Sequence, residues 1–153
     1  MANKLLSKDF KKNIKLNMDS ITKEESIILA GKFLAELGYV SPGYESAMLK
    51  RETECNTYIG SFTALPHGSY DSYNQILESG FCILQFPKGI DYDGHLVILL
   101  IAVACKENDE LQALLQVSDM LANEELRDSL LYATSVDEII HLINEHYKIE
   151  GDL

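Results

Sequence analysis

The sequence feature that most constrains the fold is the uninterrupted apolar run from Leu96 to Cys105. A strand with one solvent-facing side alternates apolar and polar residues, whereas a strand covered on both faces is apolar throughout. The ten residues of this run are too few for a membrane-spanning helix, which needs about 20. We therefore predict a central strand from His95 to Ala104, in a sheet that carries helices on both faces.

Local signals place other elements around this strand. Capping boxes are expected where a threonine or serine precedes a glutamate by three residues, at Thr22 with Glu25 and at Ser135 with Glu138. Gly38 provides a stop for the first helix, and Ser41 followed by Pro42 predicts the start of a second. The expected helices span residues 22–38, 41–52, 108–120, 124–133 and 135–147, and the expected strands span residues 13–18, 57–65, 80–86 and 95–104.

This order of elements predicts an α/β fold. With strands in the middle and helices before and after them, the chain is expected to form a single domain in which a sheet of about five strands is flanked by helices on both faces, a three-layer α/β/α sandwich. Some connections are too short for a helical crossover, so the sheet is predicted to be mixed. The expected boundaries are a short basic N-terminal segment at residues 1–12 and the domain itself at residues 13–148.

Charge and cysteine usage narrow the classes of function. The formal net charge is −11, and an acidic surface repels phosphate backbones, so no nucleic-acid partner is expected. The N-terminus lacks the apolar core of a signal peptide, and no membrane insertion is expected. Cys55, Cys82 and Cys105 form no CxxC pair, which indicates free thiols in a reducing compartment. We therefore expect a cytoplasmic protein.

His67 is the residue in this sequence best suited to carry chemistry. It lies between Pro66 and Gly68, directly after a predicted strand. Proline fixes the backbone, glycine leaves space beside the imidazole, and loops on rigid scaffolds commonly carry function. The same three residues also occur in plain turns, so spacing leaves a structural reading open.

Other sites are less favoured. His95, His141 and His146 are interpreted as structural, because none has a partner at metal-ligand spacing. The sequence contains no phosphate-binding GxxxxGK[ST] or GxGxxG motif. We expect neither a metal nor a cofactor.

The order of several short motifs resembles a known family. Arg51-Glu52, then Thr57-Tyr58-Ile59-Gly60, then Ala64-Leu65-Pro66-His67-Gly68 resemble the enzyme IIA domains of the mannitol/fructose class of the bacterial phosphoenolpyruvate-dependent sugar phosphotransferase system. The resemblance extends from about Asn13 to His146. The segment from Gln85 to Gly89 looks more like the mannitol branch than the fructose or nitrogen-regulatory branches.

The resemblance implies a phosphoryl relay. His67 would accept a phosphoryl group from the carrier protein HPr and pass it to a cysteine of an enzyme IIB, which is in some cases joined to a membrane enzyme IIC. Arg51 would stabilise the phosphoryl oxygens through its planar, permanently charged guanidinium, and Ser69 could donate its hydroxyl to them. Our hypothesis is that Nε2 of His67 faces outward while Nδ1 is held by the protein.

One position departs from the family pattern. Relatives of this branch carry a second histidine where this chain has Glu110. A carboxylate there would repel a phosphoryl group, or could hydrogen-bond to the ring of His67. Two alternatives therefore stay open: a regulatory phosphohistidine module that binds a partner according to its phosphorylation state, and a degenerate member whose site has failed.

Overall fold

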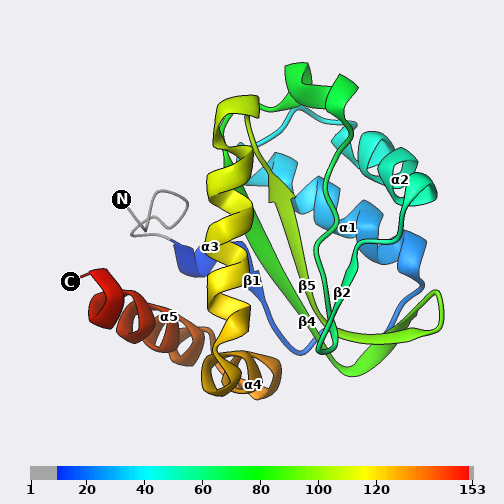
Figure 1. Ribbon diagram of the computed structural model, residues 1–153. Helices are drawn as coiled ribbons and strands as arrows, with labels where there is room; N and C mark the ends of the chain where they lie inside the picture. The colour runs from blue at the N-terminus through cyan, green and yellow to red at the C-terminus, as the bar shows by residue number, and fades with distance from the viewer. Residues whose placement is uncertain (1–9, 152–153) are drawn as a thin grey trace.

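The computed structural model describes residues 10–151, except for the side chains of Tyr70, Glu110, Leu111, Ala113, Leu114 and residues 147–151. It has three layers, as predicted (Figure 1). A five-stranded sheet forms the middle layer, helices α1 and α2 cover one face, and α3, α4 and α5 lie against the other. The predicted basic segment at 1–12 falls largely outside the described residues.

The sheet is mixed, with strand order β1-β4-β5-β3-β2. Strand β5 lies at the centre, antiparallel to β4 and parallel to β3, while β1 runs parallel to β4 and β2 antiparallel to β3. The strands are β1 (Ile14–Lys15), β2 (Tyr58–Gly60), β3 (Thr63–Ala64), β4 (Gly80–Tyr92) and β5 (His95–Ala104).

Strand β5 is buried on both faces from Val97 to Ala104, which explains its apolar composition, whereas His95 and Leu96 at its start are exposed. Leu99, Ile101 and Val103 point into the core beneath α3, α4 and α5. The alternate residues Leu100 and Ala102 point into the core beneath α1 and α2. The two-residue period of a strand thus divides one apolar run between two cores.

The helices agree closely with the sequence signals. The capping box at Thr22 is present, with Thr22 Oγ1 accepting from the Glu25 amide at 3.1 Å and Glu25 Oε1 accepting from the Thr22 amide at 3.0 Å. The α-helices are α1 (Lys23–Glu36), α2 (Tyr44–Glu54), α3 (Glu110–Ala122), α4 (Glu124–Tyr132) and α5 (Val136–Gly151). Short 3₁₀ helices occupy Phe10–Asn13, Tyr70–Gln75 (η2) and Glu107–Asp109.

Helix α2 starts later than predicted. Pro42 is not its first residue, because Gly43 adopts a left-handed conformation with φ of 97° and the helix begins at Tyr44. A glycine takes this conformation at little steric cost. The helix also runs to Glu54 rather than to Glu52.

Three strand predictions were also wrong in their ends, and the predicted strand 13–18 is reduced to Ile14–Lys15. The predicted strand 57–65 is a hairpin of β2 and β3, in which Ser61 and Phe62 have positive φ, as a two-residue turn requires. Strand β4 does not stop at Phe86, because the segment around Pro87 forms a bulge between Gln85 and Ile90 and the strand continues to Tyr92. A bulge tolerates a proline that has no amide hydrogen to donate.

Candidate functional site

His67 lies at the edge of the sheet where parallel strands end. The chain leaves β3 after Ala64, and Pro66 O accepts a hydrogen bond from the amide of Val103 at 3.0 Å. His67 is bridged to Val103 of the central strand. Side chains at the carboxyl ends of parallel strands converge at one sheet edge, a common place for ligands in α/β proteins. This extended pairing with β5 places the imidazole beside the last residues of that strand.

The protein fixes the tautomer of His67. Nδ1 lies 2.8 Å from the carbonyl oxygen of Leu65. A carbonyl oxygen can only accept a hydrogen bond, so Nδ1 carries the proton, and the lone pair of the neutral ring is on Nε2. The side chain is partly exposed and lines a cavity. The geometry supports the hypothesis that Nδ1 is held while Nε2 is left to react.

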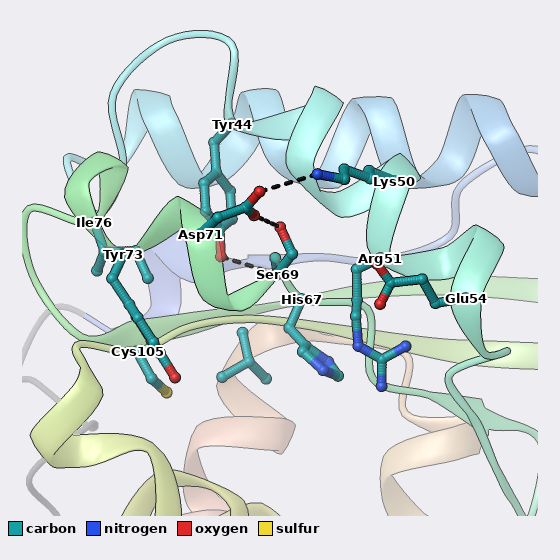
Figure 2. Close-up of a pocket in the computed structure, with 12 residues that line it drawn as sticks. Tyr44, Lys50, Arg51, Glu54, His67, Ser69, Asp71, Tyr73, Ile76 and Cys105 are labelled. Atoms are coloured by element: carbon teal, nitrogen blue, oxygen red, sulfur yellow. Dashed lines mark hydrogen bonds and ion pairs between the residues drawn. The ribbon is translucent and has the colours of Figure 1, made fainter.

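Arg51 lines the same cavity as His67 and comes from the last turn of α2 (Figure 2). Its Nη1 donates to the carbonyl oxygen of Cys55 at 3.1 Å, which fixes the side chain across the end of the helix. A guanidinium has five N–H donors, so this bond leaves it able to bind an anion as well. The structure therefore brings two residues together that are far apart in the sequence.

Ser69 also lines the cavity, but its hydroxyl is engaged by a residue that the sequence analysis did not consider. Ser69 Oγ donates to Asp71 Oδ1 at 2.5 Å, and Lys50 Nζ donates to the other carboxylate oxygen at 2.9 Å (Figure 2). The bonds from Ser69 and Lys50 hold the pKa of Asp71 below its usual value. The bond to Asp71 likewise raises the pKa of Lys50.

The fourth predicted site residue, Glu110, is the first residue of α3. The predicted helix 108–120 thus starts two residues later than expected, after the 3₁₀ helix Glu107–Asp109. Its side chain lies outside the described residues, so its predicted place beside His67 remains a prediction.

The cavity around His67 has a volume of about 520 Å³. The sequence analysis missed several residues that line this cavity, because their roles depend on packing between elements that are distant in the sequence. Lys50 adjoins the Arg51-Glu52 motif, and Asp71 follows Ser69 by two positions, but neither carries a signal of its own. The lining residues are Tyr44, Lys50, Arg51, Glu54, His67, Gly68, Ser69, Asp71, Tyr73, Ile76, Val103 and Cys105.

A buried polar cluster holds the end of α2 that carries Arg51. Glu52 Oε2 accepts from the amide of Thr57 at 2.8 Å, and Oε1 accepts from its hydroxyl at 2.7 Å. Tyr92 donates to Glu52 at 3.1 Å, and Lys23 Nζ lies 3.2 Å from Oε2. The ammonium of Lys23 also bonds to Asp93. The cluster joins α2 to α1, to β4 and to Thr57, the residue directly before β2.

Ionisation in this cluster is tuned by burial and by hydrogen bonds. Burial on its own would lower the pKa of Lys23, but the bonds to Asp93 and Glu52 outweigh it and raise the pKa. Burial raises the pKa of Tyr92, and the nearby Glu52 adds to this effect although the bond to Thr57 opposes it. At neutral pH, Lys23 is therefore charged and Tyr92 is a neutral donor.

Gly68 is required by close packing, and we predict that Gly68→Ala is destabilising. A Cβ at this position would lie 2.5 Å from the hydroxyl oxygen of Tyr44 and 2.6 Å from that of Ser72. The same Tyr44 hydroxyl accepts from the amide of Gly68 at 3.0 Å. Overpacking of this kind costs about 1–3 kcal/mol.

The free energy of unfolding in urea measures this effect, with Ser69→Ala as a control that adds no atoms to the same turn. Because Gly68 directly follows His67, a shift of the backbone in Gly68→Ala should also displace the imidazole and slow its phosphorylation. An unchanged urea midpoint would show that Tyr44 and Ser72 can move aside.

Within the described residues, no group of three or more histidine, cysteine or acidic side chains could hold a metal ion. None of the helices in the described part of the chain is long and apolar enough to cross a membrane. The cavity around His67 combines a ring nitrogen with two cationic side chains, which suit an anionic group, and with two carboxylates, those of Glu54 and Asp71.

Comparison with known proteins gives one family. The model of the family "Phosphoenolpyruvate-dependent sugar phosphotransferase system, EIIA 2" matches residues 10–146. The chain is 38% identical over 136 residues to the mannitol-specific phosphotransferase enzyme IIA component of Bacillus subtilis, covering 88% of this chain and 95% of that protein. It is 35% identical over 134 residues to the mannitol-specific EIICBA component of Escherichia coli, covering 86% of this chain and 21% of that protein.

A solved structure agrees with this match. It is a complex of enzyme IIA of the mannitol system and phosphorylated enzyme IIB from Escherichia coli. The TM-score is 0.82 at 34% sequence identity, and the alignment covers 88% of this chain and 95% of the matched chain.

Proposed function

Because the chain belongs to the EIIA 2 family of the phosphoenolpyruvate-dependent sugar phosphotransferase system, we propose that His67 is its phosphoacceptor. The chain is a phosphoryl-relay subunit of that system, as its resemblance to enzyme IIA domains indicated. The observation that carries the proposal for His67 is its fixed tautomer, with Nδ1 bound to the Leu65 carbonyl and the reactive lone pair on Nε2.

The proposed reaction has two transfers. In the first, Nε2 of His67 attacks the phosphorus of phospho-HPr, so a P–N bond forms as the P–N bond to the donor histidine breaks. In the second, the thiolate sulfur of a cysteine on enzyme IIB attacks the phosphorus, so a P–S bond forms as the P–Nε2 bond breaks. We propose that Nδ1 keeps its proton in both transfers, donating a hydrogen bond to the Leu65 carbonyl oxygen while Nε2 exchanges the phosphoryl group. Phosphoryl transfer needs mainly positioning and charge neutralisation.

The partners follow from the family. Phospho-HPr is the donor and enzyme IIB the acceptor, in agreement with the complex formed by the Escherichia coli relative. In the EIICBA relative, the matching segment is part of a longer chain named for its C, B and A components. We propose that this chain serves an enzyme IIC of the mannitol type. We also propose a cytoplasmic location, where thiols such as those of Cys55, Cys82 and Cys105 stay reduced and form no disulfide.

The proposal is tested by mass spectrometry of the intact protein after incubation with phosphoenolpyruvate, enzyme I and HPr. We expect one acid-labile phosphoryl group, which is lost when a cognate enzyme IIB is added. A known enzyme IIA is added to the same mixture as a control, and its phosphorylation shows that enzyme I and HPr are active. If this chain stays unlabelled beside a labelled control, the proposed function is wrong.

We propose that Arg51 stabilises the phosphoryl group during both transfers, and predict that Arg51→Met slows them. Removing one charged donor from a transition state typically costs on the order of 100-fold in rate. Arg51→Lys should be intermediate, because an ammonium lacks the planar fork of a guanidinium.

The measurement is the rate of phosphorylation by phospho-HPr in single-turnover experiments. The matched control is Arg127→Met in α4, since Arg127 is paired with Asp128 and does not line the His67 cavity. Equal rates for Arg51→Met and Arg127→Met would contradict the proposal that Arg51 stabilises the phosphoryl group.

A further inference from the structure

Asp71 occupies an unexpected place for a carboxylate in a phosphoryl site. Each of its two oxygens accepts one hydrogen bond, Oδ1 from Ser69 at 2.5 Å and Oδ2 from Lys50 at 2.9 Å. Both donors line the cavity that contains His67 (Figure 2). In the unphosphorylated protein, a carboxylate thus engages two of the groups that a phosphoryl group would otherwise attract.

The charges around the cavity balance before phosphorylation. Lys50 and Arg51 contribute two positive charges, and Glu54 and Asp71 contribute two negative charges, while neutral His67 adds none. A phosphoryl group carries about two negative charges near neutral pH. Phosphorylation therefore makes the cavity strongly negative, and Asp71 then repels the group that His67 has accepted.

The ion pair between Lys50 and Asp71 is weak, so Lys50 can readily bind another anion instead. The side chains of Lys50 and Asp71 are 61% and 66% exposed, and exposed ion pairs contribute little to stability because water screens both charges. An ion pair this weak does not fix Lys50 and Asp71 in one conformation. It can only shift the equilibrium between the unphosphorylated and the phosphorylated protein by a modest amount.

From this geometry we propose that Asp71 is a positioning residue that keeps the phosphoryl group on His67 transferable. Its carboxylate disfavours the phosphorylated state by like-charge repulsion, and it holds Ser69 and Lys50 so that they bind the phosphoryl oxygens less tightly. This inference rests on the proposed function of His67. A relay subunit benefits, because groups that bound the phosphorylated state too well would slow its onward transfer.

The test is the equilibrium of phosphoryl exchange between HPr and this protein. Purified phospho-HPr is mixed with each variant in the absence of phosphoenolpyruvate and enzyme I, and both phosphorylated fractions are measured by intact mass. Asp71→Asn keeps an oxygen for Ser69 but removes the charge. We expect it to shift the exchange constant toward the phosphorylated form roughly fivefold, the size expected for one exposed charge pair.

Three further variants separate this role from a structural one. Asp19→Asn removes an exposed carboxylate from the loop before α1 and should leave the exchange constant unchanged. Asp71→Glu restores the charge and should bring the constant back toward that of the wild type. Lys50→Met leaves Asp71 without its cation and should shift the constant in the opposite direction to Asp71→Asn.

The outcomes distinguish this inference from the proposed function. If the wild type is phosphorylated and Asp71→Asn has the same exchange constant as Asp19→Asn, the role of Asp71 is refuted while the role of His67 stands. A shift of Asp71→Asn away from the phosphorylated form refutes it equally. If the wild type is not phosphorylated at all, the proposed function itself is wrong.

Discussion

His67→Ala should abolish phosphorylation of this protein by phospho-HPr. The variant removes the ring nitrogen that would form the P–N bond, and no neighbouring imidazole lines the described cavity to replace it. Intact mass should therefore show one phosphoryl group on the wild type and none on the variant. His67→Gln should behave in the same way, because an amide nitrogen is not a nucleophile at neutral pH.

The loss must be separated from unfolding and from labelling elsewhere. Losing the bond from Nδ1 to Leu65 should cost about 1 kcal/mol in the free energy of unfolding, which a urea titration measures. His141→Ala, in an exposed position on α5, is the matched control and should be phosphorylated normally. Phosphorylation of His67→Ala to the wild-type extent would place the acceptor on another residue.

The same experiment addresses the alternatives raised by the sequence. A regulatory module would be phosphorylated on His67 but would fail to pass the group to any enzyme IIB. A degenerate member would not be phosphorylated at all, and Glu110→His would then be expected to restore activity, since histidine occupies that position in the branch that this chain resembles.

Glu52→Ala should destabilise the fold more than any of the substitutions at the His67 cavity. It removes the carboxylate that accepts three hydrogen bonds from Thr57 and Tyr92 and pairs with the buried ammonium of Lys23. Removing one partner from a buried ion pair leaves the other charge poorly compensated. The expected loss is about 3 kcal/mol, at the lower end of the usual range because Lys23 keeps its bond to Asp93.

The urea midpoint and the thermal midpoint measure this loss, and the double variant with Lys23→Met identifies its cause. Lys23→Met on its own should cost less than Glu52→Ala, since the carboxylate keeps its bonds to Thr57 and Tyr92. The double variant should be less destabilised than the sum of the two single variants. A loss below about 1 kcal/mol for Glu52→Ala would contradict the view that the cluster is a buried, charged network.

Glu52 also connects the stability of the fold with the position of Arg51 at the His67 cavity. It directly follows Arg51, and its bonds to Thr57 fix the chain where it leaves α2 for β2. We therefore expect Glu52→Ala to slow phosphorylation even under conditions in which the variant is fully folded. The Arg51-Glu52 motif thus joins a residue that would bind the phosphoryl group to one that holds the helix in place.

The central strand and the capping of α1 could be read from the sequence because both depend on local or periodic patterns. A strand buried on both faces must be apolar throughout, and the run from Leu96 to Cys105 met that condition. The capping box requires only residues three apart, Thr22 and Glu25. The neighbours Pro66 and Gly68 did not predict the local structure of His67, which lies in an extended segment bridged to Val103 of β5.

The ends of elements were harder to predict because neighbouring strands decide them. Pro87 suggested that the strand stops, yet the pairing of Ile90 with Val97 continues the sheet beyond a bulge. At α2, the left-handed φ of Gly43 moved the helix start past the serine-proline signal.

Sequence by itself determined the layers of this protein, its family and the histidine at the centre of the proposed site. Only the tertiary structure decided the proton position on His67, the place of Arg51 beside it, and the bonds of Asp71 to Ser69 and Lys50. The physical reason is one of range. Caps and burial patterns are set by residues close in the chain, whereas a cavity forms where a helix end, a turn and a strand end meet in space.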